Sequence, residues 1–480
     1  MAFLDFMAPP AHKPLLPQDK IDKEYKSMRL KVFLGIYLGY AAYYLVRKNL
    51  SFAASGMIEE GLIDKPGVGI AMAGIPIAYA FSKFLMGGLS DRSDARKFMT
   101  IGLVLSSLIM VVAGLIPYPM GINGDYSTTI GISFLLMLLA GWLSGMGWPP
   151  CGRVMSHWFS TNERSFKMSI WNTAHNIGNG SLGIIIPAGI VIFSTLGIEQ
   201  TWRAAFIAPA LVALLFAIVC WLFIRDTPES CGLPAIEKYR NDYSGAKANK
   251  GEETKIPFKR LFVDYILKNP TLWLIGCANI FVYFIRYGVV DWLPIYLQDE
   301  LHISETDSSF AYAILEYAGI AGTLLCGWLS SRFFQGRCAP VNVIYMAFVA
   351  LGVLAYWQSA PLATMFGVDV KYVVYASTAL IGAAIYGPVA MISIQAISIV
   401  PKNAAGTAAG FMGLLGYLIG DAMLSKIAFG YVADSSLGWD FTFECFLATS
   451  FIAAIICIVA WGKEKRMLEE RLAAAKAEQK

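Results

Sequence analysis

The chain has 480 residues, of which 56% are hydrophobic and 15% are charged, with a formal net charge of +4. Soluble globular domains carry about 25% charged residues, so this composition excludes an ordinary soluble protein and indicates a membrane protein. The basic residues are spread over many short loops instead of forming one patch, so no nucleic-acid partner is expected.

Apolar segments long enough to cross about 30 Å of hydrocarbon recur along the whole chain. They are continuously apolar and do not alternate over about ten-residue lengths, which favours helices over the strands of a membrane barrel. The sequence therefore predicts an all-α polytopic membrane protein with about twelve transmembrane helices, near residues 30–57, 67–90, 98–118, 129–156, 164–194, 203–225, 264–297, 306–331, 340–359, 370–398, 403–432 and 440–462.

Several sequence markers occur twice, in the same order and 239 or 240 residues apart. They are Arg47 and Arg286, the turns 87–92 and 327–332, and Gly147 and Gly387. This register predicts two pseudo-symmetric six-helix halves, as in transporters built from parallel repeats. The expected organisation is an N-terminal tail, an N-terminal half, a linker, a C-terminal half and a C-terminal tail, at residues 1–29, 30–225, 226–262, 263–462 and 463–480.

Lys and Arg are concentrated before the first span, in alternate loops, in the central connection and in the C-terminal tail. The intervening loops are poor in Lys and Arg. The positive-inside rule then predicts that both termini and the central linker are cytoplasmic.

The chain has eight cysteines and four histidines, and none shows the spacing of a metal-ligand set. No G-x-x-x-x-G-K-[ST] motif is present, so an ATP-driven pump is not supported. No nucleophile–base pair stands out either. The sequence predicts a protein that is not an enzyme and needs neither a metal nor a cofactor.

Arg47 and Arg286 lie inside apolar spans at matched positions of the two halves. A guanidinium at bilayer depth costs at least ~2.5–3.5 kcal/mol, which makes each arginine a functional candidate. Its planar fork of donors suits a phosphate group. The pair therefore predicts one shared site for a phosphate ester, the alternative being a structural ion pair with Asp291 or Glu316.

Tyrosine hydroxyls accompany both arginines and would add hydrogen-bond donors without adding charge. Tyr40, Tyr44 and Arg47 are spaced four and three residues apart, so they share one helical face. Other tyrosines on these or related spans extend the candidate set, with an interfacial or packing role as the alternative: Tyr43, Tyr79, Tyr283, Tyr287, Tyr386 and Tyr417.

Three basic residues lie near the candidate site. Lys83 follows Tyr79 by four residues on the same face and would either recruit an anion or extend toward the interface. His175 lies in the middle of the fifth span and would contact a titratable phosphate, or would be a hydrogen-bonded structural histidine. Lys48 points to another face than Arg47 and is expected to pair with Asp291 or Glu316 across the halves.

Two further groups of charges are less easily assigned. Asp421 and Lys426 lie five residues apart on the eleventh span, a spacing at which two residues of an α-helix do not face each other. The rim loop 87–92 contains Asp91 and Arg92, and Asp91 is expected to pair with a basic residue or a helix N-terminus as a gating latch. Ser331 replaces the acid in the second copy of this loop, so the latch is expected to be asymmetric.

The chain also resembles a known family, the organophosphate:phosphate antiporters of the major facilitator superfamily. The resemblance covers about residues 12–463 and is carried by segments 39–49, 147–153, 171–176, 226–234 and 316–327. It implies exchange of external glycerol-3-phosphate for internal inorganic phosphate across a bacterial inner membrane, by rocking of two six-helix halves. It also implies that Arg47 and Arg286 hold the phosphate and that Lys48 and Asp291 occupy salt-bridge positions. The remaining expected substrate contacts are His175, Asn172, Lys83, Tyr40, Tyr44, Tyr79, Tyr283, Tyr386 and Tyr417.

Two alternatives remain within this resemblance. The run from Tyr417 to Asp421, with Lys426, is closer to the sugar-phosphate branch, so a hexose-phosphate:phosphate antiporter is one alternative. A transporter-like sensor of phosphate esters is the other, because the same fold and site would serve it. The expected partners are phosphate esters, inorganic phosphate and the lipid bilayer, and a monomer is expected.

Overall fold

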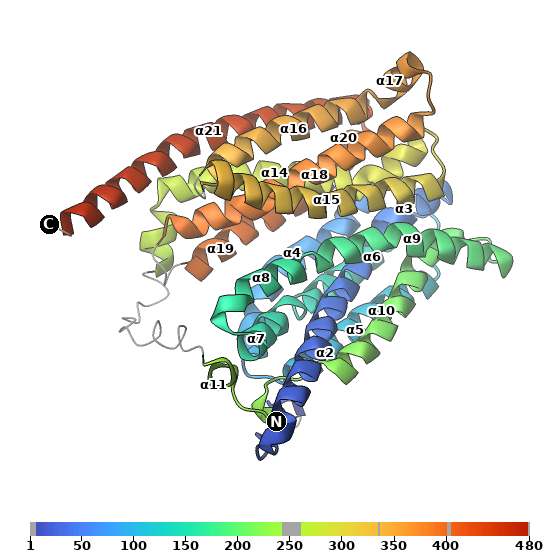
Figure 1. Cartoon of the computed structure of the whole chain (residues 1–480). Coiled ribbons are helices and arrows are strands. Elements are labelled where there is room, and N and C mark those ends of the chain that lie inside the picture. The colour runs from blue at the N-terminus through green and yellow to red at the C-terminus, as the bar shows by residue number, and fades with distance from the viewer. Residues whose placement is uncertain (1–5, 242–260, 335–336, 401–404, 479–480) are drawn as a thin grey trace. The chain divides into compact units, whose positions relative to one another are not determined.

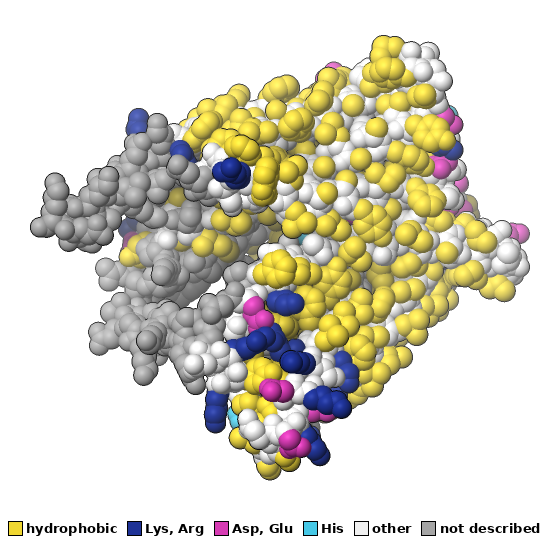
Figure 2. All heavy atoms as spheres, viewed as in Figure 1, with side chains coloured by type: hydrophobic (Ala, Val, Ile, Leu, Met, Phe, Trp, Pro, Cys, Tyr) yellow, Lys and Arg dark blue, Asp and Glu magenta, His cyan; other side chains and the backbone are white. Residues whose placement is uncertain are grey.

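The computed structural model describes residues 6–241, 261–334, 337–400 and 405–478 (Figure 1). The regular structure of this described part is helical, apart from one isolated bridge between Ile122 and Asp125. Ten of its helices are long and apolar enough to cross a membrane. Large hydrophobic side chains such as Leu215 and Ile455 are exposed along them, at 63% and 59%. Figure 2 shows this apolar surface, which suits lipid contact.

The chain forms two compact units, residues 1–64 with 74–254, and residues 65–73 with 255–480. In the first unit, α10 packs against α2 and α5, and α9 packs against α2. The helices from the N-terminus to the described start of the linker are α2 (Gln18–Leu45), α3 (Asn49–Glu59), α4 (Lys65–Ser90), α5 (Ala95–Leu115), α6 (Ser127–Ser144), α7 (Trp148–Trp158), α8 (Thr161–Asn172), α9 (Ala174–Thr195), η1 (Thr201–Arg203), α10 (Ala204–Phe223), η2 (Glu229–Cys231) and α11 (Ile236–Arg240).

In the second unit, α18 packs against α15 and α16, and α14 packs against η5 and α21. Two of its helices, η3 and η5, are π-helices. In chain order the elements are η3 (Leu261–Leu267), α14 (Pro270–Asp299), α15 (Glu305–Phe333), α16 (Ala339–Trp357), α17 (Ser359–Phe366), α18 (Val370–Ser398), α19 (Ala405–Leu414), η5 (Leu415–Ala428), α20 (Phe429–Asp434) and α21 (Gly438–Glu478).

The expected first span is interrupted between α2 and α3, beside Arg47. Val46 and Lys48 have φ near −116° and −117° with ψ of 30° and 10°, outside the α-helical region. Asn49 is 1% exposed, and its Nδ2 donates to the carbonyl of Leu45 at 3.0 Å and to that of Ala205 at 2.8 Å. Carbonyls freed by a broken helix need such partners away from water. The break is therefore held in place by α10.

Small residues let some helix pairs approach closely. A Cβ on Gly178 of α9 would collide with the backbone carbonyl of Ala41 on α2, and a Cβ on Gly382 of α18 would collide with that of Leu315 on α15. Glycine at these two crossings lets the backbones meet, as is common for helices packed in membranes. The crossings bring the elements that carry Tyr44 and His175, and those that carry Glu316 and Tyr386, close together.

The first part of the expected linker, residues 226–241, is packed on the N-terminal unit, and residues 242–260 lie outside the described part. Asp226 is 2% exposed and accepts two hydrogen bonds from Arg153, both at 2.9 Å, and one from the Ala95 backbone N–H at 3.0 Å. Ala95 begins α5, so Asp226 satisfies a donor at that helix N-terminus. Asp91, the expected latch, contributes its backbone carbonyl, which accepts from Arg153 at 2.5 Å.

Replacing Asp226 with Asn should lower the free energy of unfolding by about 3 kcal/mol, because it leaves the Arg153 guanidinium without its buried counter-ion. The measurement is thermal unfolding of the purified protein in detergent. Asp91→Asn is the matched control, and its stability should change by no more than about 0.5 kcal/mol, since the exposed Asp91 engages Arg153 through its backbone. Equal destabilisation by the two substitutions would contradict this assignment.

Candidate functional site

In the N-terminal unit, Arg47 lies at the break between α2 and α3 and contacts two aromatic faces. Its guanidinium carbon is 4.9 Å from the centroid of the Tyr44 ring and 4.3 Å from that of the Tyr79 ring. Tyr79 comes from the middle of α4 and is 3% exposed. Cation–π contacts of this kind hold a guanidinium in place while its N–H groups stay directed outward from the ring faces.

A second group of side chains connects this arginine to α9. The Tyr40 and Tyr44 hydroxyl oxygens are 3.3 Å apart, and the Tyr44 and His175 rings have centroids 5.7 Å apart. His175 lies in the first turn of α9, and its Nδ1 is hydrogen-bonded to the backbone carbonyl of Asn172 at the end of α8. A carbonyl only accepts, so Nδ1 is the donor of this hydrogen bond.

Two tryptophans that were not predicted as site residues complete the N-terminal cluster. Lys83 Nζ is 6.0 Å from the centroid of the Tyr79 ring and 5.9 Å from that of Trp148, at the start of α7. Trp171 is stacked on Tyr40, with ring centroids 4.4 Å apart. Both tryptophans belong to segments that carry the family resemblance, 147–153 and 171–176. Their spacing in the sequence did not indicate their partners, which are Lys83 for Trp148 and Tyr40 for Trp171.

In the C-terminal unit, Arg286 lies within the continuous helix α14 and is 7% exposed. Its guanidinium carbon is 4.8 Å from the centroid of the Tyr287 ring and 4.5 Å from that of Tyr386. Among the described residues, no carboxylate lies within ion-pairing distance of Arg286, and its Nε is buried without a hydrogen-bond partner. Glu316, on α15, is fully buried and acts on this arginine only from farther away.

Two further rings, Tyr283 and Tyr417, extend this aromatic cluster from Tyr287. Tyr283 and Tyr417 have centroids 5.2 Å apart, and Tyr287 lies 5.6 Å from Tyr283 and 6.1 Å from Tyr417. Tyr287 also contacts a second cation, because Lys426 Nζ is 5.1 Å from its ring centroid. The Tyr287 ring thus contacts both Arg286 and Lys426.

Lys426 forms a buried ion cluster with Asp291 and Asp421, and this corrects a prediction. Its Nζ is 2.6 Å from Asp291 Oδ2 and is also bonded to Asp421 Oδ1, and all three residues are at most 3% exposed. Asp421 and Lys426 were expected not to face each other, and that expectation is wrong because the segment is the π-helix η5. A π-helix repeats its hydrogen bonds at i→i+5, so residues five apart lie one above the other.

The structure brings most of the predicted site residues together within their own units. In the N-terminal unit, Tyr44 and Tyr79 contact Arg47, Tyr40 and His175 contact Tyr44, and Lys83 lies near Tyr79. Asn172 joins this group only through its backbone carbonyl, which is bonded to His175. In the C-terminal unit, the residues gathered around Arg286 are Tyr283, Tyr386, Tyr417 and Glu316. The expected pairing of Lys48 across the halves stays a prediction, although Asp291 binds Lys426 in its own unit. Arg92 lies exposed in the loop after α4.

Within the part of the chain that the structure describes, no group of three or more His, Cys, Asp or Glu side chains could hold a metal ion.

The sequence matches a known protein family and is similar to two named transporters. Residues 36–423 match the family described as Major Facilitator Superfamily. A glycerol-3-phosphate transporter of Bacillus subtilis (strain 168) is 43% identical over 463 residues, which cover 96% of this chain and 99% of that protein. A glycerol-3-phosphate transporter of Haemophilus influenzae is also 43% identical, over 476 residues, covering 96% of this chain and 97% of that protein.

A solved structure shows the same fold. It is a bacterial homologue of the human lysosomal transporter Spinster in an inward-facing, occupied conformation, with a TM-score of 0.66 and 16% identity. The alignment covers 90% of this chain and 97% of that chain. The predicted all-α fold of the major facilitator type is confirmed, and this chain is a multi-pass membrane protein. The prediction that it is not an enzyme agrees with relatives that are named as transporters.

Replacing Lys426 with Met should lower the free energy of unfolding by about 3–5 kcal/mol, because it leaves two buried carboxylates without their shared ammonium. The double variant Asp421→Asn with Lys426→Met should regain part of this loss. Thermal unfolding of both single variants and the double variant measures the coupling. Additive losses would show that Asp421 and Lys426 do not interact.

Proposed function

The chain belongs to the major facilitator superfamily, and on that premise we propose that it exchanges external glycerol-3-phosphate for internal inorganic phosphate. The resemblance of its motifs to organophosphate:phosphate antiporters supports the exchange. The two glycerol-3-phosphate transporters at 43% identity support the choice of ester.

Arg286 supports this proposal because its guanidinium is buried without an ion-pairing carboxylate among the described residues. A buried charge is costly unless it is paired, and a buried donor without an acceptor costs about 1–3 kcal/mol. Arg286 is 7% exposed, has no carboxylate within ion-pairing distance among the described residues, and has a buried Nε without a partner. An anionic ligand would supply both the missing charge and the missing acceptors. A phosphate carrier requires a buried cation of this kind, whose charge a bound anion can compensate.

Each half would contribute one arginine and a set of aromatic hydroxyls to the ligand. Arg47 and Arg286 would bind the phosphate oxygens through their planar forks of N–H donors. Tyr44, Tyr79 and Tyr386 hold the guanidinium groups by their ring faces. His175 would contact the phosphate from α9, next to the ring of Tyr44.

The coupling of ester uptake to phosphate release would follow from the positive charge of the binding site. The unloaded carrier holds the buried Arg286 cation in a low-dielectric interior without an ion-pairing carboxylate among the described residues, and this opposes closure and reorientation. A bound phosphate or phosphate ester neutralises this cation and lowers the barrier. Loaded forms would therefore cross faster than the empty form, so that uptake of the ester requires a counter-substrate on the other side.

The orientation that we propose follows the distribution of basic residues. Both termini and the central linker would be cytoplasmic, and the protein would be a monomer in a bacterial inner membrane.

Exchange in proteoliposomes tests the function directly. Vesicles loaded with inorganic phosphate should take up labelled glycerol-3-phosphate, and phosphate-free vesicles should take up little, because the unloaded carrier reorients slowly. Glucose-6-phosphate added outside should compete weakly. Strong competition by the hexose ester would assign the protein to the sugar-phosphate branch, and binding without uptake would indicate a sensor.

Replacing Arg286 with Lys should weaken binding of phosphate and glycerol-3-phosphate by about tenfold to a hundredfold, because a point charge cannot donate two parallel hydrogen bonds to one phosphate. The measurement is the affinity for glycerol-3-phosphate in detergent, with the melting temperature recorded alongside. Arg332→Lys is the matched control, since Arg332 is exposed at the end of α15. Near-normal affinity in both Arg286→Lys and Arg47→Lys would exclude the two arginines as the phosphate ligands.

A further inference from the structure

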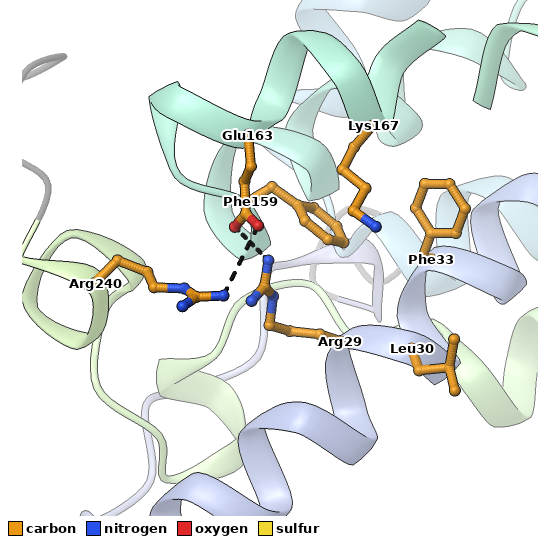
Figure 3. Close-up of a pocket in the computed structure, with 7 residues that line it drawn as sticks. All are labelled: Arg29, Leu30, Phe33, Phe159, Glu163, Lys167 and Arg240. Atoms are coloured by element: carbon orange, nitrogen blue, oxygen red, sulfur yellow. Dashed lines mark hydrogen bonds and ion pairs between the residues drawn. The ribbon is translucent and has the colours of Figure 1, made fainter. Parts of the chain in front are cut away.

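A second basic pocket lies in the N-terminal unit, away from the arginine cluster just described. It is a cavity of roughly 270 Å³ between α2, α8 and α11 (Figure 3). Pockets for drug-sized molecules measure about 300–1,000 Å³, so this cavity suits a small polar group better than a whole organic ligand. The residues that line it are Arg29, Leu30, Phe33, Phe159, Glu163, Lys167 and Arg240.

The pocket contains more positive than negative charge. Arg29, Lys167 and Arg240 face a single acid, Glu163, which binds the Nη2 of Arg29 and lies 3.9 Å from that of Arg240. Burial raises the pKa of the Glu163 carboxyl, but the hydrogen bond and charge of Arg29, together with Arg240, lower this pKa overall. Glu163 is therefore ionised at neutral pH, and the pocket keeps an excess of two positive charges.

Donors in this pocket are left without acceptors. Arg29 is 12% exposed in its side chain, and its Nε is buried with no hydrogen-bond partner among the described residues. Lys167 lies one turn beyond Glu163 on α8, over the same cavity (Figure 3), and its Nζ is 5.5 Å from the centroid of the Phe33 ring. No acid of the described part of the chain forms an ion pair with Lys167. Both side chains can thus donate to a ligand.

Two of the helices that line the pocket, α2 and α8, also carry exposed apolar side chains. Leu30 and Leu34 lie one turn apart on α2 and are 62% and 37% exposed, and Phe166 and Ile170 lie one turn apart on α8 and are 67% and 37% exposed. Figure 2 shows charged side chains gathered at one end of the N-terminal unit, next to the apolar surface of its helices. A ligand that combines an anionic group with hydrocarbon chains would match both parts.

We propose that this pocket binds the headgroup phosphate of an anionic phospholipid from the leaflet on the side of the N-terminus. Basic pockets between membrane helices bind acidic headgroups in this way. The phosphate would accept hydrogen bonds from Arg29, Lys167 and Arg240, and the acyl chains would lie along Leu30, Leu34 and Phe166.

The bound lipid would also tie the start of the linker to the N-terminal half. Arg240 ends α11, which is held to α2 by the stacked rings of Tyr25 and Tyr239, 3.9 Å apart, and by a hydrogen bond from Tyr25 to the Pro234 carbonyl at 3.1 Å. A phosphate that contacts Arg240, Arg29 and Lys167 at once would add a third connection between these elements.

Native mass spectrometry of the purified full-length protein tests the proposal without reference to transport. Phosphatidylglycerol should be retained and phosphatidylcholine should not. Lys167→Gln and Arg240→Gln should each weaken phosphatidylglycerol binding about fivefold, because each removes one charged donor from the bound phosphate. Lys26→Gln, an exposed position on the same helix α2, is the matched control and should leave binding unchanged.

The variant Glu163→Gln should bind phosphatidylglycerol more tightly, an increase that a purely structural role of the pocket residues would not produce. It removes the acid that competes with the phosphate, and it keeps the capping box of Ser160 and residue 163, in which Gln serves as well as Glu. Phosphatidylglycerol binding should therefore tighten about fivefold. Unchanged or weaker binding in Glu163→Gln, or loss of phosphatidylglycerol equal in Lys26→Gln and Lys167→Gln, would overturn the proposal. Displacement of the lipid by millimolar inorganic phosphate would also overturn it, because the pocket would then be a site for free phosphate.

Discussion

The burial of a guanidinium without a counter-ion is the constraint on which the rest of this structure depends. Arg286 lies inside an apolar helix at 7% exposure, and the described part of the chain offers it aromatic faces instead of a carboxylate. Tyr287 and Tyr386 hold the cation by the negative faces of their rings, which stabilises it without neutralising it. In the function proposed above, a bound anion would compensate the remaining cost, so the feature that destabilises the empty site would also produce its affinity.

The acids of the C-terminal unit are placed to keep this arginine available. Asp291 follows Arg286 by five residues on the α-helix α14, a spacing at which the two side chains do not face each other, and it lies 2.6 Å from Lys426. Asp421 is bonded to the same ammonium, so two acids are held by one lysine. The π-helical form of η5 makes this possible, because it brings residues five apart into line. A regular α-helix would separate Asp421 from Lys426 and change which acids lie near the site.

The two halves hold their arginines by different local structures despite their matched positions in the sequence. Arg47 lies at a break between two helices, which Asn49 stabilises through the carbonyls of Leu45 and Ala205. Arg286 lies in an unbroken helix of 30 residues. Breaks in membrane helices expose backbone groups that need buried partners, and they recur at the binding sites of transporters. The first arginine therefore lies at a helix break and the second on the face of a continuous helix.

The sequence by itself determined the fold class and most of the apolar spans, because hydrophobic length is a property of composition and order. It also proposed the residue types of the candidate site, because charges inside apolar spans stand out. Arg47, Tyr40 and Tyr44 could be grouped from their spacing, and Arg286 could be matched to Arg47 by the internal repeat. The tertiary structure alone decided the partners of these residues. Trp148 and Trp171 reach Lys83 and Tyr40 through contacts between helices that are distant in the sequence. Lys426 binds Asp421 because the backbone departs from the α-helical repeat, and the side-chain pattern did not predict this departure. The pocket of Arg29, Lys167 and Arg240 likewise exists only because three segments far apart in the chain fold onto one another.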